Sequence, residues 1–176
     1  SVQLMRVDEF KNILRVLSRN IKITDKPTFE FNISKTVSEK IKQLIDRRFN
    51  GDDKFLVVVN PCGKREANNW PAERFNEVAK YLIQSFGARI LVIGGEKDIA
   101  TAKKIGNNLP ASNFISLAGE LDRLETLELI KYAKFVLSID TGAVHMASAM
   151  GVPVVGIYNV RNVFGKWFPY GSNHKI

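Results

Sequence analysis

Short runs of aliphatic residues that do not alternate with polar ones recur along residues 55–157 of this chain. Strands of this kind are buried on both faces, which is typical of a parallel sheet covered by helices on each side. Amphipathic segments with helical periodicity separate the runs. With right-handed crossovers, this alternation predicts an α/β fold: a doubly wound parallel sheet of about five strands. The predicted strands are 55–59, 89–93, 113–117, 135–139 and 152–157, and the predicted helices are 72–86, 97–109, 123–133 and 141–150.

The chain divides into a helical, basic lead-in at residues 1–50 and the strand–helix region at 51–176. Helical periodicity in the lead-in covers residues 7–17 and 34–49, and we interpret it as a crossover from a preceding domain. The last stretch, 159–176, is rich in Gly, aromatic and basic residues, and we predict no further element there. The sequence therefore predicts one Rossmann-like domain, as a fragment of a longer chain.

Charge and composition narrow the possible partners. The net charge is +8, and the lead-in alone holds 11 Lys/Arg against 6 Asp/Glu. A basic surface attracts anionic lipid, nucleic acid or a phosphorylated substrate, although a solvated face explains the charge equally well. The sequence has no zinc-ligand spacing and no RNA-reading aromatic motif, so we expect no nucleic-acid partner. No apolar run is long enough to cross a bilayer, and the single Cys62 excludes an internal disulfide and suits a reducing, cytoplasmic compartment.

The most informative loop follows the predicted strand 135–139, where Asp140, Thr141 and Gly142 open a helix. Ligands of open parallel sheets bind beyond the carboxyl ends of the strands, and the amides of a first helical turn attract anions. A diphosphate suits this place, with the Thr141 hydroxyl as an added donor and Asp140 as an acceptor for sugar hydroxyls. His145, one turn into the helix, faces the same opening and can donate to a phosphate oxygen. The alternative is that Asp140 or Thr141 only caps the helix and that His145 packs or lies in solvent.

Three more loops leave the carboxyl ends of predicted strands. After the first strand, Gly63 can offer a backbone N–H and Lys64 a positive charge to a phosphate. After the second, Glu96 is placed to accept from ribose hydroxyls or to contact a base. A glycine turn followed by acidic residues at a helix start is an equally good interpretation of that loop. After the predicted strand 113–117, which has the least pronounced apolar run, Gly119 allows the chain to pass close to a base.

The order of these motifs resembles the carboxyl-terminal domain of the lipopolysaccharide heptosyltransferases, glycosyltransferase family 9. The similarity covers roughly two thirds of the chain, from about residue 55 to 170. The matching motifs are Asn-Pro-x-Gly starting at Asn60, Trp70-Pro71 before a helix, Gly-Gly-Glu ending at Glu96, Leu-Ala-Gly ending at Gly119, Asp-Thr-Gly-x-x-His from Asp140 to His145, and Gly151-x-Pro153. The Trp-Pro motif and the last two motifs of this series are the specific part of the resemblance.

The resemblance implies a two-domain GT-B architecture in which this domain binds the donor. It implies an inverting glycosyltransferase, independent of metal and of any cofactor, that transfers heptose from ADP-heptose to the lipopolysaccharide core. The acceptor and the general-base carboxylate would belong to an amino-terminal domain missing from this chain, so the fragment would bind donor without turnover. The enzyme would work at the cytoplasmic face of the inner membrane, with peripheral contact to anionic lipid.

Individual roles carry over by position. The resemblance implies that Thr141 and Gly142 hold the diphosphate and that Asp140 binds heptose hydroxyls. It implies that His145 supports the phosphate and that Glu96 lies near the adenosine.

One position departs from the family pattern. The family carries a Lys two residues before the Trp of Trp-Pro, facing the donor phosphates, where this chain has Asn68. Lys64 or Arg65 is a candidate substitute. Two other functions therefore stay open: another GT-B enzyme, or a related epimerase, that uses a UDP-sugar, and a non-catalytic nucleotide-binding module of the same fold.

Overall fold

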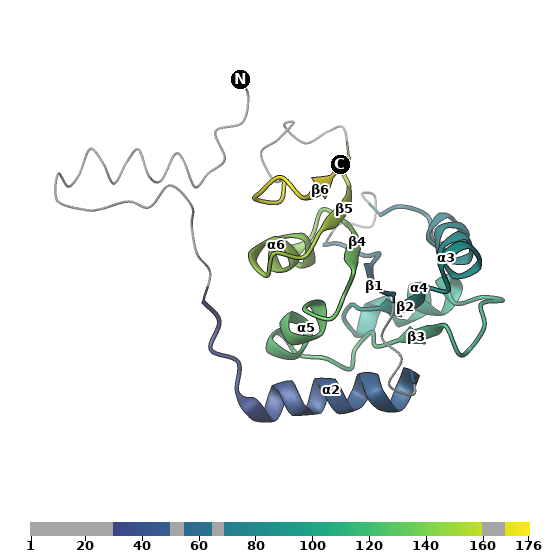
Figure 1. The fold of residues 1–176 in the computed structure, drawn as a ribbon. Helices are drawn as coiled ribbons and strands as arrows, with labels where there is room; N and C mark the ends of the chain where they lie inside the picture. Colours follow the sequence, from purple (N-terminus) through teal and green to yellow (C-terminus); the bar gives the residue numbers. More distant parts are fainter. Residues whose placement is uncertain (1–29, 50–54, 65–68, 160–167) are drawn as a thin grey trace, which may run out of the picture.

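A computed structural model describes residues 30–49, 55–64, 69–159 and 168–176 (Figure 1). The helix predicted at 7–17 lies outside the described residues, as do Arg65 and Asn68. The strands are β1 (Leu56–Asn60), β2 (Arg89–Val92), β3 (Phe114–Ser116), β4 (Phe135–Ile139), β5 (Val154–Ile157) and β6 (His174–Lys175). The helices are α2 (Lys35–Phe49), α3 (Ala72–Phe86), the 3₁₀ turn η2 (Glu96–Asp98), α4 (Ile99–Ile105), α5 (Arg123–Ile130) and α6 (Gly142–Ala149).

The strands form one sheet in the order β3-β2-β1-β4-β5-β6, and every neighbouring pair is parallel. The predicted α/β class and doubly wound parallel sheet are therefore confirmed. Strand order reverses between β1 and β4, because the chain winds outward from β1 to β3 and then returns to the other side of β1. Such a reversal leaves a crevice at the carboxyl ends of the two central strands.

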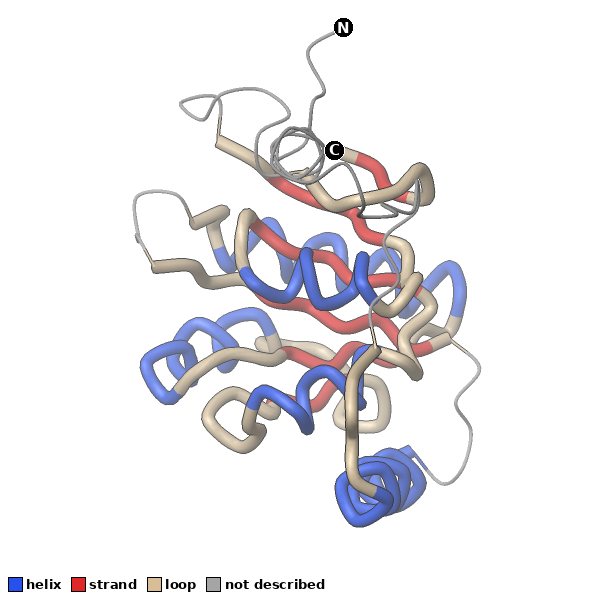
Figure 2. The backbone as a smooth tube through the Cα atoms, turned by 90° about the vertical axis from the view of Figure 1, so that its left-hand side faces the viewer, coloured by secondary structure: helices blue, strands red, loops and turns tan. Residues whose placement is uncertain are grey.

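Alternate residues of the central strands enter two separate hydrophobic clusters, one on each face of the sheet. In β1, Leu56 and Val58 belong to the cluster that α2, α5 and α6 cover, whereas Val57 and Val59 belong to the cluster under α3 and α4. Figure 2 shows α5 and α6 in front of the strands, with α2 below them. Burial on both faces explains why these strands are apolar throughout.

Helix α3 has the predicted bounds, whereas α4 is shorter than predicted. Helix α3 ends where Gly87 adopts a left-handed conformation (φ 63°) and its amide bonds the Ile83 carbonyl at 2.9 Å. The segment predicted as a helix over 97–109 is the η2 turn followed by α4, which ends before Gly106. A Cβ at Gly106 would lie 2.4 Å from the Phe114 ring, so the glycine lets the chain pass under β3.

Helix α2, the described end of the lead-in, packs into the domain. Ile41, Ile45 and Phe49 are buried in the cluster with α5 and α6. Polar contacts fix the helix further: Lys40 is paired with Glu125 of α5, and the Arg89 guanidinium lies 4.8 Å from the centre of the Phe49 ring.

The prediction that residues 159–176 hold no further element is wrong, because β6 pairs with β5 in parallel. His174 fastens this short strand. Its Nδ1 accepts from the Val154 amide at 3.2 Å, and its Nε2 lies 2.9 Å from the Tyr170 carbonyl oxygen. Strand β6 has only two residues, which is too short for a hydrophobic period, so the sequence pattern contains no signal for it.

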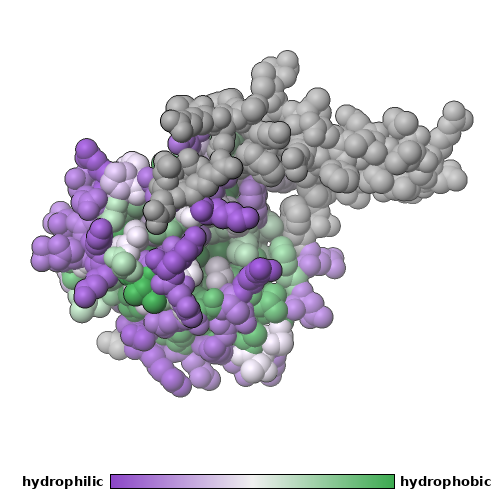
Figure 3. All heavy atoms as spheres, turned by 180° about the vertical axis from the view of Figure 1, so that it is seen from behind, coloured by the Kyte–Doolittle hydropathy of each residue, from purple (hydrophilic) through white to green (hydrophobic). Residues whose placement is uncertain are grey.

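The surface of the described part is mixed in character. Figure 3 shows hydrophilic side chains around the rim of one face, with hydrophobic ones between them. Across the described residues, no helix combines the length and the apolar character needed to cross a membrane.

Candidate functional site

The candidate site lies at the carboxyl edge of the sheet, where β1 and β4 are direct neighbours. Asn60, the last residue of β1, is in register with Ser138 of β4. Asp140 and Thr141 then lead from β4 into α6. This is the crevice that the reversal of strand order creates, so the topology places the predicted Asp-Thr-Gly motif where ligands of such sheets bind.

Thr141 is the N-cap residue of α6. Its backbone is extended (φ −143°, ψ 173°), and its Oγ1 accepts from the Ala143 amide at 3.3 Å. Helix capping, the alternative considered for this residue, is thus present in the structure. Gly142 follows as the first helical residue, and apart from its own helix no atom of the described residues lies within 4 Å of where a Cβ would stand. Within the described part of the chain, the space beside the first turn of α6 is therefore open.

A chain of hydrogen bonds connects Thr141 to both central strands. Asn60 donates from Nδ2 to Thr141 Oγ1 (3.2 Å), and Ser138 Oγ lies 3.0 Å from the same oxygen. Ser138 also donates to the Ile139 carbonyl at 2.7 Å, which leaves the Thr141 hydroxyl to donate to Ser138. All bonding positions of the Thr141 hydroxyl are then used within the protein. In this arrangement Thr141 shapes the turn, and phosphate contact would fall to backbone amides.

Sequence reasoning missed the role of Asn60, which appeared only as the first residue of a motif. Its Oδ1 is buried and has no hydrogen-bond partner among the described residues. A buried acceptor without a donor costs free energy, and the Nδ2 bond to Thr141 offsets part of that cost. The only available signal was an Asn at the end of an otherwise aliphatic strand.

We expect Thr141→Val to lower the free energy of unfolding by about 1–3 kcal/mol, because the isosteric change strands the Ala143 amide and the Asn60 Nδ2 group. Thr141→Ser keeps the hydroxyl and serves as the control, with a loss below about 0.5 kcal/mol. Urea denaturation of the two variants measures the difference. Equal stability of the valine and serine variants would contradict the network.

Asp140 precedes the N-cap of α6, and His145 lies in the first turns of that helix, close enough for its charge to act on Asp140. Asp140 is partly buried, and His145 is exposed. Burial raises the pKa of Asp140 above its ordinary value, and the nearby His145 opposes that rise. A carboxylate and an imidazole are thus held beside the open helix start.

Gly63 approaches the start of α6 from the loop after β1. A Cβ there would lie 3.2 Å from Ile139 Cδ1 and 3.7 Å from Thr141 Cγ2. Its amide donates to Asn69 Oδ1 at 2.9 Å, so the predicted offer of this N–H to a phosphate would require that bond to open. Lys64, the next residue, is exposed.

A second cation reaches the same loop. Lys97 Nζ lies 3.4 Å from the Gly63 carbonyl oxygen, and its charge lowers the pKa of the Cys62 thiol against the larger raising effect of burial. We assigned Lys97 no role from the sequence, because a lysine in a surface turn is unremarkable there.

Glu96 and Gly119 lie together at the neighbouring ends of β2 and β3. Gly119 has a positive φ of 81°, and its amide donates to the Gly94 carbonyl at 2.9 Å. A Cβ at Gly119 would stand 3.3 Å from Glu96 Cα, so this loop needs a glycine to pass. Asp98 accepts from the Gly95 amide at 2.8 Å, so acidic capping of the turn is also present. Glu96 itself is exposed, in the turn that follows β2.

The order of these residues along the edge follows the strands. Glu96 and Gly119 stand beyond β2 and β3, Gly63 beyond β1, and Asp140 with Thr141 beyond β4. Within the described residues, no three His, Cys, Asp or Glu side chains gather closely enough to hold a metal ion.

The fold is a Rossmann-like doubly wound parallel sheet, with the candidate site at its carboxyl edge. The sequence matches the family described as glycosyltransferase family 9 (heptosyltransferase) over residues 9–176, and the chain belongs to this family.

Individual relatives are longer than this chain. The chain is 26% identical over 137 residues to the lipopolysaccharide core heptosyltransferase OpsX of Haemophilus influenzae, a match that covers 77% of this chain and 38% of that protein. The fold matches a family 9 glycosyl transferase from Veillonella parvula with a TM-score of 0.83 at 21% identity, covering 99% of this chain and 49% of that one. It also matches Escherichia coli heptosyltransferase WaaC with ADP-2-deoxy-2-fluoro heptose, with a TM-score of 0.67 at 21% identity and coverage of 99% and 50%.

Proposed function

We propose that this chain is the donor-binding domain of an inverting, metal-independent heptosyltransferase that transfers heptose from ADP-heptose to the lipopolysaccharide core. The observation that carries the proposal is the open start of α6 beside Gly142, with Asp140 and His145 at its mouth. The family match and the likeness to heptosyltransferase folds support the same class of reaction.

In this proposal the diphosphate lies against the first turn of α6, where backbone amides and the helix dipole favour negative charge. Gly142 leaves room for it, and His145 supports a phosphate oxygen. Lys64 in the loop after β1 and Lys97 in the η2 turn add positive charge in place of the lysine that Asn68 replaces. Fixed positive groups stabilise the charge that builds up on the leaving diphosphate in the transition state.

The sugar and the nucleoside then extend in opposite directions along the sheet edge. Asp140 accepts from heptose hydroxyls at the β4 end. Glu96 and Gly119 contact the adenosine at the β2–β3 end. The lipopolysaccharide core and the general base come from an amino-terminal domain outside this chain, and the complete enzyme acts in the cytoplasm, at the inner membrane.

Calorimetric titration of the chain tests the donor. We expect ADP-heptose and ADP to bind at least about tenfold more tightly than UDP, because the proposal places an adenine base at the β2–β3 end of the edge, where the smaller uracil would make fewer contacts. Tighter binding of UDP would favour a UDP-sugar enzyme. Binding of ADP with no gain from the heptose would favour the non-catalytic module, and binding of none of the three would reject the donor site.

A further inference from the structure

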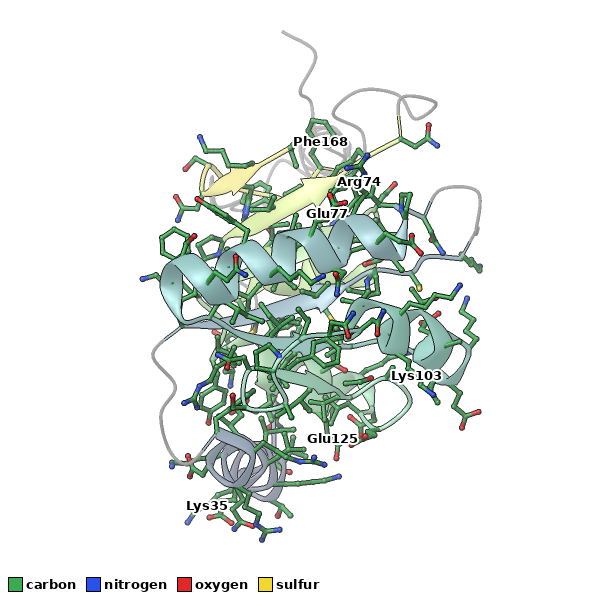
Figure 4. The ribbon with its side chains drawn as sticks, turned by 90° about the vertical axis from the view of Figure 1, so that its right-hand side faces the viewer. Lys35, Arg74, Glu77, Lys103, Glu125 and Phe168 are labelled. Carbon is green, nitrogen blue, oxygen red and sulfur yellow. The ribbon has the colours of Figure 1, made fainter. Side chains whose placement is uncertain are left out.

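A groove lies between α3 and α4, and its lining residues are different from those of the candidate site at the carboxyl edge of the sheet. Its cavity volume is about 650 Å³, a size typical of small-molecule sites. Figure 4 views the molecule from the side that these two helices cover, with Glu77 labelled on α3 and Lys103 on α4. The groove is lined by polar residues of both helices, among them Glu73, Asn76, Lys80, Lys103 and Lys104.

Three lysines of this groove have no acidic partner among the described residues. Lys80 comes from α3, and Lys103 and Lys104 belong to the last turn of α4. By contrast, three lysines of α2 each pair with a carboxylate. Glu77 also borders the groove, but its carboxylate pairs with Arg74 at 3.0 Å and takes no part in the site. The groove therefore carries an excess of positive charge, and the partly buried Lys80 gains more from an anion than a fully exposed lysine would.

Asn76 adds a fixed polar group, one helical turn from Lys80. It lines the groove although it is only 9% exposed. Its Nδ2 donates to the carbonyls of Ile105 (2.6 Å) and Asn107 (2.9 Å), so the carbonyls at the end of α4 are satisfied without a lysine. Among the described residues, its Oδ1 has no hydrogen-bond partner. The groove thus combines mobile cations with an oriented acceptor.

We propose that this groove is a second ligand site, which binds a phosphorylated polyol. The lysines surround the phosphate, because charge-assisted hydrogen bonds to phosphate are stronger than neutral ones. The Asn76 Oδ1 and the Glu73 carboxylate accept hydrogen bonds, so they suit the hydroxyl groups of the ligand, few of which inorganic phosphate offers. A free sugar phosphate and the phosphoglycerol headgroup of a lipid share this chemistry. The site does not depend on the function proposed for the carboxyl edge.

Calorimetric titration of the complete protein with glucose 6-phosphate, with and without saturating ADP, tests the proposal. We expect saturable binding that ADP leaves unchanged, and at least about threefold tighter than that of inorganic phosphate. Lys103→Gln/Lys104→Gln should weaken the binding at least about tenfold, because two charged partners are lost. Lys35→Gln/Lys134→Gln is the matched control: it removes the same charge from exposed lysines outside the groove, and the affinity should stay within about twofold.

Co-sedimentation with vesicles of phosphatidylglycerol, compared with phosphatidylcholine, identifies the source of the ligand. Binding to phosphatidylglycerol that only the groove variant loses assigns the lipid headgroup, whereas such a loss with glucose 6-phosphate alone assigns a free sugar phosphate. Binding of neither probe, equal losses in the two double variants, or loss of binding when ADP is present would overturn the groove site. Inorganic phosphate that binds as tightly as glucose 6-phosphate would overturn the recognition of a polyol.

Discussion

Replacing Asp140 with asparagine in the complete enzyme is expected to lower kcat/KM for sugar transfer by about a hundredfold. Asparagine keeps the shape of the side chain but exchanges a two-oxygen acceptor for an amide, so hydroxyls of the sugar lose a charged partner. The measurement is the initial rate of ADP release from ADP-heptose. Glu77→Gln is the control, because Glu77 is exposed on α3, where it pairs with Arg74 at 3.0 Å (Figure 4).

The same variant should unfold at an equal or higher temperature at neutral pH. Burial raises the pKa of Asp140 in the folded protein above its ordinary value of 3.8. The folded state therefore holds this proton more tightly than the unfolded state, and stability falls as the pH rises from about 3.8 through the raised value. Above that window the ionised carboxylate costs folding free energy, and asparagine removes the cost. A drop in both activity and thermal midpoint would instead mark Asp140 as structural.

Replacing Phe75 with alanine should lower the free energy of unfolding by about 3–5 kcal/mol. Phe75 is 1% exposed in the cluster under α3, and Trp70 contacts it edge-to-face at 5.0 Å. Alanine removes the transfer free energy of a whole ring and leaves a cavity between α3 and the sheet. Because small domains are stable by only about 5–15 kcal/mol, this is a large fraction of the total. Guanidinium denaturation monitored by circular dichroism measures the change.

Phe86→Ala gives a control of the same residue type on the same helix. Phe86 is 54% exposed and stacks on Phe55 at 5.6 Å, so its loss should cost about 0.5–1.5 kcal/mol. Similar losses from the two substitutions would show that the ring of Phe75 is not packed as the structure places it.

The strands and most helices could be predicted because their signal is local. A run such as Leu-Val-Val-Val in β1 is apolar throughout, since both of its faces are covered, and the following helices keep their period of 3.6. The Asp-Thr-Gly motif was also predictable in position, because the carboxyl ends of parallel strands meet at one edge of the sheet. The ends of some elements, as at Gly106, and the short strand β6 depended on contacts with distant residues.

The connections between those loops could not be predicted, because they join residues far apart in the chain. Asn60 and Thr141 are 81 positions apart, yet a hydrogen bond joins them. The ring of Tyr158 depends on a glycine two residues earlier and on Phe168. None of these contacts has a periodic signature. Sequence patterns thus predicted which loops reach the carboxyl edge of the sheet, and the structure was needed to show the hydrogen bonds between them.

The burial of α2 has a practical consequence for isolating the domain. A polypeptide that started at residue 51, where the strand–helix region was predicted to begin, would lack Ile41, Ile45 and Phe49. The apolar side of β1 and the flank of α5 would then face water, and such an exposed patch promotes self-association. Glu125 would lose Lys40 and keep its charge in a largely buried place. Helix α2 therefore belongs to the same packed unit as the sheet, and a stable version of this domain should keep residues 35–49.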